Sequence, residues 1–202
     1  MSFFTTILTV RRPPLSAAFC LLLLCSAVLI TAQEKTGGVL TTKIYQIGEK
    51  GPSEGIVFYD KGSFSDGWRY MEIASKDVSY NAGWFNARSV AAVTSPSIGS
   101  GKANTRAIVK ILGPGQYAAA LCDDLVLGGY DDWFLPSKDE LNLVFMNLAR
   151  TGQYIFKGSR YWSSSQLESN SDRTWIQYFD SDGMFFYGDK KVTCFVRPVR
   201  SF

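Results

Sequence analysis

Charged and aromatic side chains that could hold a ligand gather between residues 168 and 191. Exposed aromatic rings can stack on the C–H faces of sugars, and basic groups bind sulfate and carboxylate groups. The alternative is that the rings belong to the core and that the charges are ordinary solvated groups. The candidate ligand-binding residues are Glu168, Asp172, Arg173, Trp175, Tyr187, Lys190 and Lys191.

A possible calcium loop lies inside the same region. Asp180, Asp182 and Gly183 form the pattern D-x-D-G. A complete calcium loop needs more oxygen ligands and a glutamate six residues after the glycine, where this chain has Asp189. We therefore expect a plain turn and no cofactor, with calcium bound by Asp180 and Asp182 as the alternative.

Catalysis that depends on histidine is excluded, because the chain has no histidine. The run Ser163–Ser165 follows Trp162, and a packed strand with small polar contacts is expected there in preference to a nucleophile. Ser137, Lys138, Asp139 and Glu140 match the S-x-x-E capping box, so the two acids are expected to cap a helix. The sequence therefore predicts a protein that is not an enzyme.

The first part of the chain has the layout of a secretory signal. Two arginines precede an apolar run at residues 15–32, and polar residues follow. We expect a signal peptide at 1–32, a short segment at 33–44 and one domain at 45–202. An uncleaved membrane anchor and a lipoprotein leader are the alternatives. Cleavage removes two arginines and no acid, so the net charge falls from +3 to +1, which does not favour a nucleic-acid partner.

Only Cys122 and Cys194 remain after cleavage. In an oxidising compartment an isolated pair favours a disulfide over a metal site. Such a bond would close a loop of about 70 residues and would stabilise the fold by roughly 4 kcal/mol.

The order of the expected elements predicts an α+β fold with a mainly antiparallel sheet. Strands are expected first, at residues 55–59 and 69–75. Helices follow at 104–112, where Ile108, Ile111 and Leu112 are expected on one apolar stripe, and at 116–129. Another helix is expected from 137 onward, where a core-facing stripe runs from Leu141 to Leu148. Strands return at 160–165, 174–179, 184–190 and 193–200.

Several motifs together resemble the Lcl C-terminal domain, which is named for a bacterial collagen-like adhesin. They are IGSGKANTRAIVKIL, AALCDDLVLGGYDDWFLPSKDELNLVF, YWSSS and FVRPVRSF. The similarity extends from about Ile47 to Phe202. It implies a C-type-lectin-like fold related to the formylglycine-generating enzymes, with two or three helices, a twisted antiparallel sheet and a disulfide from a helix to the last strand. Cys122 and Cys194 match that arrangement, and residues 166–173 stand where such folds carry a ligand-binding loop.

The same resemblance implies secretion or display on a bacterial cell surface, and binding that includes sulfated glycans in the adhesin. The collagen-like repeat of the adhesin is missing here. We expect a non-enzymatic binding or adhesion module whose partner is an extracellular glycan or a surface protein. Membrane contact is expected only if the leader stays uncleaved. The alternatives are an oxidase of the formylglycine-generating type and a structural envelope protein without a sugar ligand.

Overall fold

The computed structural model describes residues 43–86, 91–180 and 182–202, all within the unit from Thr42 to Phe202. The expected signal peptide and the first ten residues of the segment at 33–44 lie outside the described residues. In the described part of the chain, no helix is both long enough and apolar enough to cross a bilayer.

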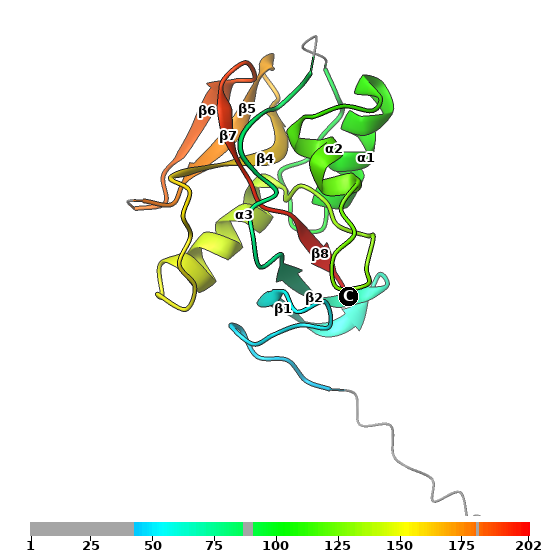
Figure 1. The fold of residues 1–202 in the computed structure, drawn as a ribbon, viewed down its shortest axis with the longest axis vertical. Coiled ribbons are helices and arrows are strands. Elements are labelled where there is room, and N and C mark those ends of the chain that lie inside the picture. Colours follow the sequence, from blue (N-terminus) through cyan, green and yellow to red (C-terminus); the bar gives the residue numbers. More distant parts are fainter. Residues whose placement is uncertain (1–42, 87–90, 181) are drawn as a thin grey trace, which may run out of the picture. The chain divides into compact units, whose positions relative to one another are not determined.

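A small antiparallel sheet joins the first strands of the chain to the last one, in the order β1-β2-β8 (Figure 1). β1 is Ile56–Ser65, β2 is Trp68–Ile73 and β8 is Val199–Ser201. Asp66 and Gly67 connect β1 to β2, and both have positive φ angles of 54° and 82°. Two consecutive residues with positive φ form the tight turn that matches the twist of a hairpin.

A second sheet has five strands in the order β3-β7-β4-β5-β6. β3 is Ser79–Gly83, β4 is Arg160–Leu167, β5 is Asn170–Tyr178, β6 is Phe185–Asp189 and β7 is Thr193–Val196. Only β4 and β7 run parallel, and their other neighbours pair antiparallel. The sequence did not predict β3, because its residues Ser, Asn, Ala and Gly are more typical of a loop than of a strand.

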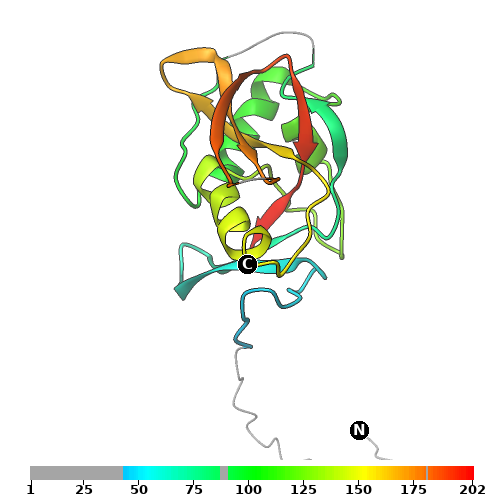
Figure 2. The ribbon, with the colours of Figure 1, turned by 90° about the vertical axis from the view of Figure 1, so that its left-hand side faces the viewer.

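Helices fill the space beside both sheets. α1 (Gly101–Leu112) and α2 (Ala118–Asp123) lie together, and α3 (Lys138–Val144) lies apart from them and continues as one π-helical turn, Phe145–Ala149 (Figures 1 and 2). α2 is much shorter than the predicted helix at 116–129, because the chain leaves the helix after Asp123. The α+β class and the mainly antiparallel pairing are confirmed.

Two apolar clusters form the core. One packs α1 and α2 against the five-stranded sheet, and the other packs α3 and its π-helical turn against the small sheet. The predicted stripe of α3 is confirmed, since Leu141, Val144 and Leu148 are all buried. The buried face of α1 differs from the prediction, because Ile111 is 40% exposed while Asn104 and Thr105 face inward.

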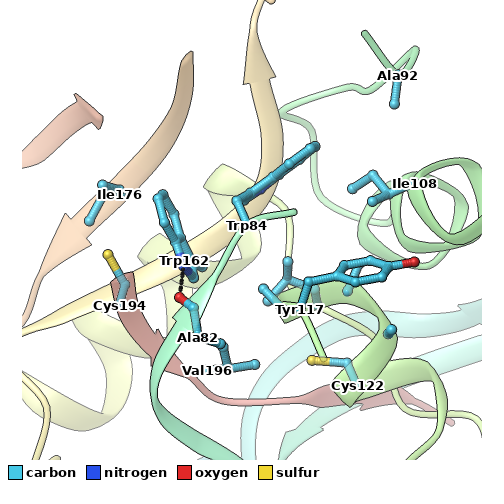
Figure 3. Packing of buried hydrophobic residues seen from close by; sticks show 14 residues of the cluster. Ala82, Trp84, Ala92, Ile108, Tyr117, Cys122, Trp162, Ile176, Cys194 and Val196 are labelled. Carbon is cyan, nitrogen blue, oxygen red and sulfur yellow. Dashed lines mark hydrogen bonds between the residues drawn. The ribbon is translucent and has the colours of Figure 1, made fainter. Parts of the chain in front are cut away.

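The predicted disulfide between Cys122 and Cys194 is wrong, because both thiols are free and buried. Figure 3 shows their sulfurs on opposite sides of Ala82 and Val196, with Cys122 on α2 and Cys194 on β7. Burial raises the pKa of Cys194 to about 12 and raises that of Cys122 well above its ordinary value. The two residues act as small apolar groups within one cluster and not as a covalent link.

Candidate functional site

Three aromatic rings lie on one face of the β5–β6 hairpin. Trp175 is paired with Tyr187 across the strands, and Phe185 stands two residues from Tyr187 on the same face. The ring of Trp175 meets Tyr187 and Phe185 edge-on, with centroids 6.0 and 6.2 Å apart. Tyr187 is 43% exposed, and the other two are half-buried. The predicted pair Trp175 and Tyr187 is therefore brought together on a partly open surface.

Two cations border these rings. The Lys138 Nζ lies 4.4 Å from the ring centroid of Trp175 and 4.9 Å from that of Phe185. The guanidinium carbon of Arg173 lies 5.3 Å from the ring centroid of Tyr187. Cations at these distances are attracted to the ring faces, which fixes the rings as well as the cations. The sequence did not single out Lys138 or Phe185 as site residues, although register alone places Phe185 beside Trp175.

A pocket of about 290 Å³ opens next to Trp175. It combines an indole ring, the ammonium group of Lys138 and the carboxylate of Glu168, and Glu168 lies in the turn between β4 and β5. The pocket is lined by Pro96, Lys138, Gln166, Leu167, Glu168, Ser169 and Trp175. An apolar ring with a few polar groups of both signs suits a ligand that has both C–H surface and hydroxyl groups.

The three serines of β4 act as connectors between this site and the rest of the fold. The Ser163 hydroxyl donates to the Trp175 carbonyl at 2.8 Å. The Ser165 hydroxyl accepts from the Lys138 backbone N–H at 3.0 Å and donates to the Ser95 carbonyl at 2.9 Å. All three serines are fully buried. The prediction of a packed strand with small polar contacts is confirmed.

Glu140 holds two segments together at the start of α3. The capping box is present, since the Ser137 hydroxyl accepts from the Glu140 N–H at 3.3 Å and the Ser137 N–H donates to Glu140 Oε2 at 2.7 Å. Glu140 Oε1 also accepts from the N–H groups of Gly99 and Gly101, at 2.8 and 3.3 Å. Sequence spacing predicts the capping box, but it cannot reveal the two distant glycines.

The carboxyl group of Glu140 is fully buried. Burial raises its pKa to about 7, and the backbone hydrogen bonds from Ser137, Gly101 and Gly99 offset part of that rise. A carboxyl group that accepts three backbone hydrogen bonds from its own fold has a structural role here, as the capping motif indicates.

The remaining predicted ligand residues, Asp172, Lys190 and Lys191, do not line the Trp175 pocket. Asp172 and Lys191 are exposed, at the start of β5 and in the turn after β6. Lys190 is only 1% exposed, with its Nζ 4.1 Å from the ring centroid of Trp84 and a hydrogen bond to the Gln166 side chain. Burial lowers the pKa of Lys190 to about 8. Lys190 therefore does not add charge to the surface. Side chains of β6 point alternately to the two faces of the sheet, and Lys190, which follows β6, is on the buried face.

Asp180 and Asp182 are exposed near the turn between β5 and β6. Across the residues that the structure describes, no group of three or more His, Cys, Asp or Glu side chains could hold a metal ion.

The two arginines of the terminal V-R-x-V-R motif are buried in ion pairs. Arg197 Nε lies 2.6 Å from Asp77 Oδ1. Arg200 bonds the Glu72 carboxylate at 2.7 Å and the Asp132 carboxylate at 2.6 Å. These arginines link the last residues of the chain to Glu72, Asp77 and Asp132. The motif therefore has a structural role and contributes no residue to the Trp175 pocket.

A search of curated proteins returns no match. The family model of the Lcl C-terminal domain matches residues 74–200, which include both sides of the Trp175 pocket, the capping box and the terminal arginines. The chain belongs to the Lcl C-terminal domain family.

Proposed function

We propose that this chain is a secreted or surface-displayed, non-enzymatic adhesion module that binds a glycan through the rings of Trp175, Tyr187 and Phe185. The observation that carries the proposal is the partly exposed aromatic face beside a polar pocket. A sugar ring stacks on the indole, while Glu168 and Lys138 exchange hydrogen bonds with its hydroxyl groups. Binding needs neither a metal nor a reactive thiol.

The charges around the site favour an uncharged glycan over a sulfated one. Arg173 lies opposite Asp189 in the register of β5 and β6, and the carboxylate of Asp189 accepts from the Lys191 backbone N–H at 2.8 Å. Glu168 and Asp172, both exposed in the β4–β5 hairpin, add two further negative charges to this region. A sulfated chain prefers an unopposed cluster of arginines and lysines, and burial of Lys190 removes one member of the predicted cluster.

The proposal includes a C-type-lectin-like fold and a bacterial cell-surface location. Support for the fold comes from the family membership, the mainly antiparallel sheets and the pairing of the last strand with the N-terminal hairpin. Support for the location comes from the signal-like leader at residues 1–32.

The oxidase alternative gains no support from the cysteines. That chemistry needs an accessible pair of thiols, and Cys122 and Cys194 are buried, apart from each other and raised in pKa. The other alternative, a structural envelope protein without a sugar ligand, assigns no binding role to Trp175. An experiment that measures glycan binding therefore separates it from the proposal.

The test is a screen of the purified chain on immobilised uncharged and sulfated glycans, followed by titration of the best binder. Trp175→Ala is expected to weaken binding about fivefold or more, since an aromatic stack contributes about 1 kcal/mol beyond buried area. Trp175→Phe should retain part of the affinity. The matched control is Phe64→Ala, which removes an exposed ring, 71% accessible, on β1. Equal binding by wild type and Trp175→Ala, or no binding to any glycan, contradicts the proposal.

A further inference from the structure

A second groove surrounds Trp68, at the start of β2. It consists of two cavities of about 520 and 330 Å³, which share Asp66, Trp68 and Gly99. Tyr59 stands on the first cavity with its ring centroid 6.2 Å from that of Trp68. Trp68 itself is half-buried, so part of its ring surface forms the wall of the groove. Each of the two cavities is larger than the Trp175 pocket of about 290 Å³.

The charges in this groove occur in opposite pairs. Lys61 Nζ lies 3.5 Å from Asp66 Oδ2 and 3.8 Å from the ring centroid of Trp68. Lys102 Nζ lies 3.9 Å from Asp132 Oδ2. Two cations and two carboxylates cancel, so the groove has no preference for a strongly charged ligand. Paired donors and acceptors beside an aromatic ring are the groups that bind the hydroxyls and the C–H face of a sugar.

One short segment separates this groove from the Trp175 pocket. Pro96 lines the pocket, whereas Ile98, Gly99 and Ser100 line the groove. Two residues of extended chain span at most about 7 Å, so the lining residues Pro96 and Ile98 lie within about that distance of each other. A ligand longer than a single sugar can therefore reach from one hollow into the other.

This separating segment, residues 96–100, is tied to the start of α3. The Pro96 carbonyl accepts from the Asp139 N–H at 3.0 Å, and the Ser97 carbonyl accepts from the Ser137 hydroxyl at 2.9 Å. The Gly99 N–H donates to Glu140 at 2.8 Å. The residue next to Ser137 is Lys138, which lines the Trp175 pocket. The same capping box thus sets the spacing of the two hollows, and a spaced pair of sites needs such rigidity.

From these observations we infer that the glycan bound by this chain is an extended, uncharged polysaccharide, with one sugar on Trp175 and another on Trp68, and with the chain crossing residues 96–100. The inference rests on the proposed glycan-binding function. It adds a second subsite that contains Trp68, Tyr59 and Asp66. Linking two weak sites through one ligand raises the overall affinity, because the second contact forms at a high effective concentration.

The test uses uncharged glucans, mannans and chito-oligosaccharides, each from disaccharide to octasaccharide, titrated against the purified chain. For the series that binds, we expect the affinity to rise at least tenfold from disaccharide to octasaccharide. Trp68→Ala should abolish that rise while the disaccharide affinity stays within about twofold of wild type. Trp175→Ala should weaken every length.

Two variants keep the test independent of folding. Asp66→Asn tolerates the positive φ of 54° and removes one carboxylate from the groove, so it should weaken octasaccharide binding severalfold with an unchanged unfolding midpoint. Phe64→Ala is the matched control and should leave both lengths unaffected. Binding that is independent of length, or a rise that survives in both Trp68→Ala and Asp66→Asn, overturns the second subsite alone. Absence of binding at every length overturns the proposed function as well.

Discussion

Replacing Glu140 by glutamine should change how the stability of the protein depends on pH. The pKa of Glu140 is raised by burial to about 7, above its ordinary 4.5. A carboxyl group with a raised pKa binds its proton more tightly in the folded state. Its contribution is therefore complete below pH 4.5 and is lost as the pH rises through 7. At about 1.4 kcal/mol per pH unit, the free energy of unfolding of the wild type falls by about 3 kcal/mol across that interval.

Glutamine has no proton to lose in this range, so the variant should lack that slope. At pH 5 we expect Glu140→Gln to be about 1–3 kcal/mol less stable than wild type. In the wild type the Ser137 N–H donates a hydrogen bond to Oε2 of Glu140, whereas in the variant the NH₂ group of glutamine faces that N–H and cannot accept from it. At pH 8 the deficit should shrink or reverse, since the wild type has lost its own contribution by then.

Urea unfolding, followed by tryptophan fluorescence at pH 5, 6, 7 and 8, measures both effects, provided that the m-value is unchanged. Asp139→Asn is the matched control, because it removes one carboxylate from the same helical turn and leaves the buried one in place. Parallel pH curves for wild type and Glu140→Gln would refute the reasoning that burial dominates the energetics of this carboxyl group.

Two further predictions concern the buried ion pairs and the thiols. Arg200→Ala should cost about 3–5 kcal/mol in urea unfolding, because it leaves a buried carboxylate without its partner. Lys50→Ala, which removes an exposed pair with Glu54, should change stability by less than about 0.5 kcal/mol. Alkylation without reductant should leave Cys122 and Cys194 unlabelled in the native protein and label both in urea, and a linked peptide containing the two would contradict the fold.

The local parts of the fold were predictable because their causes lie within a few residues. The capping box of Ser137 and Glu140, the apolar stripe from Leu141 and the strand at 160–165 follow from spacing alone. The buried face of α1 was not predictable in that way. It presents Asn104 and Thr105 to the core, and each finds a partner in a distant backbone, which no local pattern records.

The candidate site was predicted in part. Trp175 and Tyr187 were singled out from residue type, and strand register places them opposite each other. Lys190 was expected at the surface, yet β6 turns it onto the face that packs against Trp84. The groove at Trp68 gave no signal in the sequence, because its walls come from β1, β2 and residues 98–102, which meet only after folding.

The sequence by itself determined the α+β class, the capped helix, the aromatic strands and the membership of the Lcl C-terminal domain family, because each depends on residue type and near spacing. Only the tertiary structure decided that Cys122 and Cys194 lie apart, that the Glu140 carboxylate also holds Gly99, and that two hollows flank residues 96–100. The physical reason is that these features depend on the distance between segments far apart in the chain. That distance is set by the packing of the whole core and not by any local preference of the backbone.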